Sequence, residues 1–214
     1  MKFIDKIGKH IKKNISFVQR ITEIKQIETI AASDSNKISP TDLLEKVAEL
    51  LANAHLKFAI AGGFARSVHA SPRATGDVDI VVAIKDLNAT KDVLQTAGFQ
   101  FKETLDYQKP TRLILKYEYQ GRELDIINYQ KYPQFVDFLL QTTSTKTLFK
   151  SSYPFLGLEG LIVTKLCSFR YKDKADLVDL IELKPDLNII KNWCSALDIM
   201  ARFSFMSEDH SKEK

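Results

Sequence analysis

The chain has 214 residues, of which 44% are hydrophobic and 27% are charged, and its formal net charge is +4. This balance is typical of a soluble globular protein and excludes a collagen-like, a disulfide-scaffold or a wholly disordered chain. No apolar run approaches the roughly 20 residues needed to span a bilayer. The two cysteines share no metal-ligand spacing. We therefore expect a cytoplasmic protein without stable membrane insertion.

The first segment is basic and amphipathic. Residues 1–30 contain seven Lys/Arg and three Asp/Glu, which accounts for the whole net charge. Isoleucines recur there at steps of three and four, the spacing of a helix with one apolar face. Residues 1–38 are therefore predicted to form an amphipathic helix and a linker. The simplest role for this helix is to fold back on its own domain; a membrane surface or a partner protein are the alternatives.

Residues 39–132 read as a mixed α/β core. Ser39 and Pro40 are suited to the N-cap and the first position of a helix that places Leu43, Leu44 and Leu51 toward a core. Apolar runs rich in Val and Ile then alternate with turn residues, which indicates strands. The predicted elements are strands at 58–61, 78–84, 99–104, 111–119 and 123–129, a short helix from 62, a helix at 87–97, and a turn at Gln120-Gly121.

The pattern becomes mostly helical after this core. Helices are predicted at 134–141, 159–171, 173–183 and 187–203, which makes 133–206 a helical C-terminal half. The polar residues 207–214 are expected to be disordered. The fold class that follows is α/β (α+β), with a mixed sheet flanked by helices.

The strand at 78–84 begins with two acidic residues. Side chains alternate along a strand, so Asp77 and Asp79 point to one face while Val78 and Ile80 point to the other. Two neighbouring carboxylates repel each other unless a cation lies between them. Hard oxygen ligands of this kind suit Mg²⁺, which retains waters and substrate phosphates as its other ligands.

Two further features belong to the same pattern. Gly62 and Gly63 end one strand and open a helix, where backbone can approach a phosphate closely. A third carboxylate, Asp125, lies between the apolar Leu124 and Ile126 and so faces away from the core. Each feature alone is an ordinary turn or a solvated carboxylate, but their combination is specific.

This combination resembles the DNA polymerase β-type nucleotidyltransferase superfamily. The form Arg73-x-Thr75-x-Asp77-x-Asp79 is most similar to AbiEii-type nucleotidyltransferases, many of which are toxins of type IV toxin–antitoxin systems. The resemblance covers residues 41–183. Leu158–Leu166, with Lys165, is similar to the family's lysine-bearing helix. The family's Lys-Asp-x-x-Asp-Leu stretch is matched in two competing registers around Asp173, Asp176 and Asp179.

The resemblance implies roles for individual residues. Asp77, Asp79 and Asp125 would hold two Mg²⁺ ions, with Mn²⁺ as an alternative, and Asp125 could accept the proton of the acceptor hydroxyl. Lys165 would bind the triphosphate; without the resemblance it would be read as a lysine that extends to the surface. The NTP would be bound by Gly62, Gly63, Arg66, Arg73, Thr75, Lys165 and Asp176.

The implied activity is transfer of a nucleoside monophosphate from an NTP to a hydroxyl acceptor, with release of pyrophosphate. The acceptor implied first is tRNA, which would make the protein a toxin with a cognate antitoxin. The alternatives are a small-molecule acceptor, as in antibiotic-modifying members, and a non-catalytic nucleotide-binding or interaction protein. Arg170, Lys172 and Lys174 form a basic cluster that is equally consistent with a solvated face and with a tRNA phosphate contact.

Overall fold

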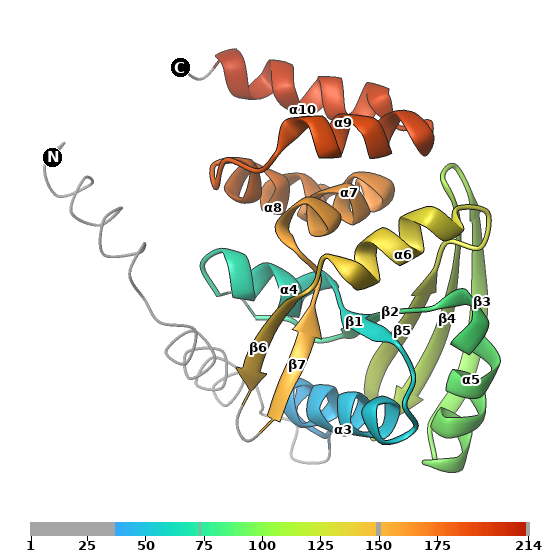
Figure 1. The fold of residues 1–214 in the computed structure, drawn as a ribbon. Helices are drawn as coiled ribbons and strands as arrows, with labels where there is room; N and C mark the ends of the chain where they lie inside the picture. Colours follow the sequence, from blue (N-terminus) through green and yellow to red (C-terminus); the bar gives the residue numbers. More distant parts are fainter. Residues whose placement is uncertain (1–36, 73, 149–150, 213–214) are drawn as a thin grey trace, which may run out of the picture.

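A computed structural model describes residues 37–72, 74–148 and 151–212. The amphipathic helix predicted within residues 1–38 therefore lies outside the described residues, as does Arg73. The strands form one seven-stranded mixed sheet in the order β3-β4-β5-β2-β1-β7-β6 (Figure 1). The strands are β1 (Phe58–Ile60), β2 (Val78–Val82), β3 (Gln100–Gln108), β4 (Thr111–Tyr119), β5 (Arg122–Asn128), β6 (Ser144–Leu148) and β7 (Ser151–Phe155).

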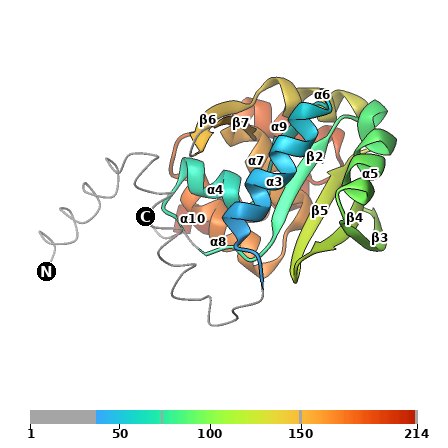
Figure 2. The same cartoon turned by 90° about the horizontal axis from the view of Figure 1, so that it is seen from below.

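Helices lie on both sides of this sheet. Helices α3 and α5 pack together on one face, whereas α7, α8, α9 and α10 form a stack beyond the other (Figures 1 and 2). The mixed sheet and the helical C-terminal half confirm the predicted fold class. None of the described helices is long and apolar enough to cross a membrane. The helices are α3 (Pro40–Asn53), α4 (Gly62–His69), the 3-10 turn η1 (Ile84–Asp86), α5 (Leu87–Thr96), α6 (Pro133–Gln141), α7 (Leu158–Ser168), α8 (Tyr171–Ile181), α9 (Leu187–Ala196) and α10 (Met200–Lys212).

The start of α3 is as predicted. The Ser39 hydroxyl accepts a hydrogen bond from the Asp42 backbone N–H at 3.0 Å, which satisfies one of the unpaired donors at the start of a helix. Pro40 occupies the first turn, where its missing N–H has no cost. Leu43 and Leu44 on the inner face are fully buried and join the core.

The turn between β4 and β5 fixes the register of these two strands. Gln120 and Gly121 both have positive φ angles, of 46° and 74°, as in the two-residue turns that match strand twist. The resulting register places Lys116 opposite Asp125. A slip of one residue would turn Asp125 into the core, so this turn determines which way the carboxylate points.

The hairpin β6–β7 is absent from the sequence prediction, which assigned only helices after residue 133. Both strands are polar or contain proline, and β6 is an edge strand, so neither carries the apolar alternation that signals a strand. Pro154 lies within β7, opposite Thr145. The C-terminal half therefore contributes two strands to the sheet of the core.

The single helix predicted at 187–203 is wrong: α9 ends at Ala196 and α10 begins at Met200. Asp198 adopts a left-handed φ of 55° between them, and the Ile199 N–H donates to the Cys194 carbonyl at 2.9 Å. This is a helix stop without glycine, which composition does not signal. Helix α10 then continues through Lys212, where we expected a disordered tail; the segment contains neither Gly nor Pro.

Candidate active site

The glycine pair forms the turn between β1 and α4. Gly62 has a positive φ of 57°, and a Cβ atom there would overlap the carboxylate of Asp79. A Cβ on Gly63 would lie 2.5 Å from the Thr75 Oγ1 atom. Both positions therefore require glycine, because the side chains of Asp79 and Thr75 lie against the backbone there. No side chain caps the start of α4, and its first N–H groups lie beside this contact.

The three predicted carboxylates line one cleft. Asp79 on β2 and Asp125 on β5 are direct partners in the parallel pairing of these strands. Asp77 immediately precedes β2, and its Oδ1 atom accepts a hydrogen bond from the Thr75 hydroxyl at 3.0 Å. The sheet thus brings Asp125 next to two carboxylates that lie 46 and 48 residues earlier in the sequence.

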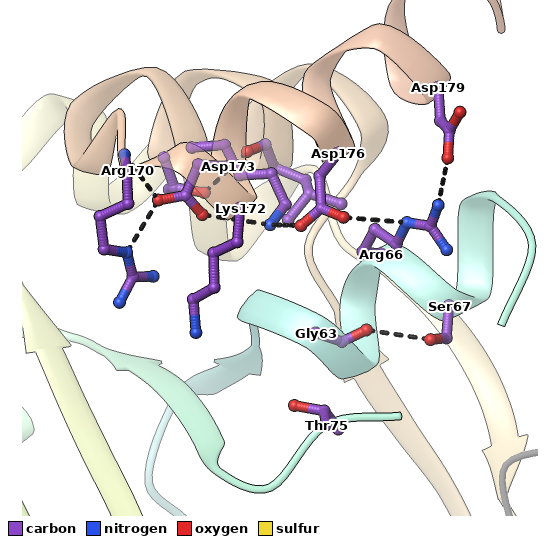
Figure 3. Close-up of polar contacts among 12 residues, drawn as sticks. Gly63, Arg66, Ser67, Thr75, Arg170, Lys172, Asp173, Asp176 and Asp179 are labelled. Carbon is purple, nitrogen blue, oxygen red and sulfur yellow. Dashed lines mark hydrogen bonds and ion pairs between the residues drawn. The ribbon is translucent and has the colours of Figure 1, made fainter. Parts of the chain in front are cut away.

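The carboxylates differ in their cationic partners. Lys116 Nζ lies 3.0 Å from Asp125 Oδ1, and Lys172 Nζ lies 3.7 Å from Asp77 Oδ2. Figure 3 shows Lys172 extending from α8 below the row of buried acids. Within the part of the chain that the structure describes, Asp79 forms no ion pair. Of the three carboxylates, Asp79 is therefore the one whose negative charge has no cationic side chain in direct contact among the described residues.

The pKa values follow from these environments. Burial raises the pKa of Asp79 to about 7, and the charges of Asp77 and Asp125 act in the same direction. Burial also raises the pKa of Asp125, against the opposing hydrogen bond from Lys116. For Asp77, burial is outweighed by the Lys172 ammonium and the Thr75 hydroxyl, so its pKa is lowered. The cleft therefore contains one carboxyl that a bound cation would strongly favour in its ionised form.

The donor set fits Mg²⁺ in kind, since carboxylate oxygens are the ligands this ion prefers. The described residues contain no group of three or more Asp, Glu, His or Cys side chains already arranged to hold a metal ion. Lys116 and Lys172 instead hold Asp125 and Asp77. For a metal ion to bind here, the ammonium groups of Lys116 and Lys172 would have to move away from the carboxylate oxygens of Asp125 and Asp77.

Lys165 lies on α7, which is apolar around most of its circumference, and its side chain is buried. Its Nζ atom lies 2.6 Å from Asp176 Oδ2 and 3.6 Å from Asp173 Oδ1. The lysine does not extend to the surface, and two buried carboxylates compensate its charge. Asp173 and Asp176 thus both face Lys165, while Asp179 is directed elsewhere.

Arg66 does not line the cleft. Its guanidinium pairs with Asp176, with 3.3 Å between Nε and Oδ1, and also bonds Asp179 and the Ser71 carbonyl (Figure 3). It therefore ties α4 to α8 instead of pointing toward a triphosphate position. Asp176 is likewise outside the lining, so its contact with the cleft passes through Lys165.

Several lining residues are absent from the sequence prediction. They are Leu105, Tyr107, Arg112, Ile114, Lys116, Ile127, Tyr129, Thr164 and Ser168. Lys116 was accessible to sequence reasoning, because a two-residue turn at 120–121 already sets it opposite Asp125. The others depend on how α7 and α8 fold over the sheet, which no local pattern reveals.

A comparison with protein families matches the part of the chain that contains Asp77, Asp79 and Asp125. Residues 43–131 match the model of the aminoglycoside-2''-adenylyltransferase family, which is less than half of the chain. No curated protein matches the sequence.

Solved structures resemble the fold at low sequence identity. The solution structure of the antibiotic-resistance factor ANT(2'')-Ia has 14% identity and a TM-score of 0.53, over 81% of this chain and 96% of that one. Lincomycin-bound LnuA, a lincosamide antibiotic adenylyltransferase, has 19% identity and a TM-score of 0.47, over 70% and 99%. An antigenic nucleotidyltransferase-like protein from Paracoccidioides brasiliensis has 21% identity and a TM-score of 0.44, over 77% and 91%. The first of these likenesses shows a shared nucleotidyltransferase-type fold, while the narrower AbiEii-type resemblance stays a prediction.

Proposed function

We propose that the chain is a nucleotidyltransferase that transfers a nucleoside monophosphate from an NTP to a hydroxyl group of a small molecule. The observation that carries this proposal is the convergence of Asp77, Asp79 and Asp125 in one cleft, beside a turn that must be Gly62-Gly63. The family match over 43–131 supports the same reaction class.

The chain's own residues divide the work. The backbone N–H groups at Gly62 and Gly63, at the start of α4 where no side chain caps the helix, bind phosphate oxygens. The acceptor oxygen attacks the α-phosphorus, the bond from that phosphorus to the bridging oxygen breaks, and pyrophosphate leaves. Asp125 takes the proton of the hydroxyl, a role suited to a carboxylate whose pKa burial has raised.

Asp77, Asp79 and Asp125 would hold Mg²⁺, or Mn²⁺ in its place. When bound, the cation supplies positive charge that offsets the negative charge on the reacting phosphate and on pyrophosphate. Lys165 lies at the edge of the same cleft, and Asp176 holds its ammonium group in place. Thr75 positions Asp77 through its hydrogen bond and is not assigned a phosphate contact.

A small-molecule acceptor is favoured over tRNA. The family model describes an aminoglycoside adenylyltransferase, and the structural likeness with a TM-score of 0.53 is to an antibiotic-resistance factor. The toxin role, a cognate antitoxin and a tRNA acceptor, which the AbiEii-type resemblance implied, receive no such support. The experiment below distinguishes transfer to tRNA from transfer to a small molecule.

The test is incubation of the protein with each α-labelled NTP and Mg²⁺ in the presence of hydroxylated small molecules or total tRNA. We expect labelled small-molecule product with the wild type and none with Asp79→Asn. Gln108→Ala, on an exposed strand end outside the cleft, is the matched control and should retain activity. Label in tRNA alone would establish the tRNA-modifying alternative. NTP binding without any transfer would establish the non-catalytic one.

A further inference from the structure

The cleft continues beyond the carboxylates along β5, β4 and β3. Three successive rows of side chains form its floor, which the strand registers define. The acidic row contains Asp79, Asp125 and Lys116, and the apolar row contains Ile127, Ile114 and Leu105. The arginine row contains Arg112 and Tyr107, with Tyr129 beside them. Four residues along a strand separate Lys116 from Arg112, or about 13 Å at the usual rise per residue.

Arg112 is a buried cation without a carboxylate partner. Its relative exposure is 6%, and its neighbours are neutral: the Ser168 hydroxyl accepts from Nη1 at 2.6 Å, and the Tyr107 ring lies 4.4 Å from the guanidinium carbon. The Nε atom is buried and has no hydrogen-bond partner in the described structure. A buried guanidinium is costly without a counter-charge, so this arrangement favours an anion supplied by a ligand.

The other cations of the cleft are already compensated. Lys116 pairs with Asp125, Lys172 with Asp77, and Arg170 with Asp173 at 2.9 Å. Lys165 lies between Asp173 and Asp176. Among the cationic lining residues that the structure describes, Arg112 alone is without an ion-pair partner.

The sheet order decides which substrate reaches Arg112. The glycine turn lies at the end of β1, on one side of the carboxylate strands, and β4 and β3 lie on the other. In an in-line displacement the acceptor enters opposite the departing pyrophosphate. With the phosphates at the turn, the acceptor must therefore lie over β5, β4 and β3, with its far end near Arg112.

We propose that Arg112 and Tyr107 form the acceptor-recognition subsite, and that the acceptor is a small molecule carrying a phosphate or carboxylate group at the end remote from its reacting hydroxyl, so that it spans the about 13 Å between the acidic row and the arginine row. This proposal rests on the proposed function. It predicts that polycationic aminoglycosides are poor acceptors here, because their ammonium groups would meet an uncompensated guanidinium. The apolar row between the two ends suits an uncharged middle portion of the acceptor.

The first test observes Arg112 directly, without metal or nucleotide. In the ¹⁵N-labelled protein, the Arg112 Nε–H resonance is assigned through its own side-chain carbons, so no variant needs to fold. Inorganic phosphate or acetate is then titrated at constant ionic strength against chloride. We expect this resonance to shift with saturation. The Nε–H resonance of Arg122, which donates to the Ile38 carbonyl at 2.9 Å outside the cleft, is the matched control and should stay in place. Equal movement of the two resonances, or none, would overturn the subsite.

The second test compares acceptors under transfer conditions. Hydroxylated compounds with a terminal phosphate or carboxylate should be preferred over aminoglycosides. Arg112→Gln should raise KM for the anionic acceptor about 10- to 100-fold, the loss expected for a charge-assisted hydrogen bond, while KM for the NTP is unchanged. A rise in KM for the NTP, or efficient transfer to aminoglycosides, would overturn the proposal and leave the proposed function intact. A shifted Arg112 resonance without transfer to any acceptor would instead contradict the proposed function and leave the anion subsite standing.

Discussion

Replacing Asp79 with asparagine should stabilise the metal-free protein at alkaline pH. The folded state raises the pKa of Asp79 from 3.8 to about 7. As the pH rises through this window, the unfolded chain ionises Asp79 freely while the folded chain does not, so the free energy of unfolding falls. At 1.36 kcal/mol for each unit of pKa difference, the full effect is about 4 kcal/mol above pH 7, of which about 2.5 kcal/mol develops between pH 5 and 8. The neutral amide of Asn avoids this cost.

The assay is urea unfolding of the wild type and Asp79→Asn at pH 5 and pH 8, with EDTA present. The variant's advantage in unfolding free energy should grow by about 2–3 kcal/mol between the two pH values. Asp77→Asn is the matched control of opposite sign. The pKa of Asp77 is lowered in the fold, so its carboxylate contributes stability above its unfolded pKa that the amide loses at both pH values.

The reasoning is refuted if the advantage of Asp79→Asn is the same at pH 5 and pH 8. A second readout at pH 8 is the effect of Mg²⁺. The cation should raise the unfolding free energy of the wild type, since it binds the folded state, and should have a much smaller effect on Asp79→Asn.

Two further substitutions test the packing around the site. Gly62→Ala should lower the free energy of unfolding by at least about 1–2 kcal/mol and abolish transfer, because a Cβ at φ 57° overlaps the Asp79 carboxylate. Gly76→Ala is the control, since no atom lies within 4 Å of its Cβ. Equal losses of unfolding free energy in the two variants would contradict the steric argument. Lys165→Met should cost about 3–5 kcal/mol because it removes the buried ammonium group between Asp173 and Asp176, whose carboxylates then keep only Arg170 and Arg66 as cationic partners. Lys102→Met, which breaks an exposed pair with Glu118, should cost under about 1 kcal/mol, and a comparable loss in the two variants would show that burial does not govern the Lys165 pair.

Local sequence patterns predicted the strands of the core and the side on which their acidic residues lie. Both depend on residues that are close together in sequence, through side-chain alternation and turn geometry. Alternation along β2 and β5 was enough to place Asp79 and Asp125 on the face away from the core. The Gln120-Gly121 turn then fixed the register of β4 against β5.

The partners of the site residues could not be predicted in the same way. Lys165 pairs with Asp173 and Asp176 only because α8 folds back on α7, and Arg66 reaches Asp179 across 113 residues of sequence. The side-chain types do not distinguish a lysine that binds phosphate from one held by buried carboxylates. Arg112 was not predicted, because an arginine in an apolar strand is ordinarily expected at the surface. Its burial depends on contact with the end of α7 at Ser168, which the sequence does not show.

The shared use of Asp176 joins the two halves of the chain. One of its oxygens faces Lys165 on α7 and the other faces Arg66 on α4. Two buried cations from different parts of the sequence therefore share one carboxylate. Local opening of α8 would expose both at once and leave them without a counter-charge. The amide hydrogens of α4 and α8 should therefore exchange with solvent through the same opening event, at a similar free energy.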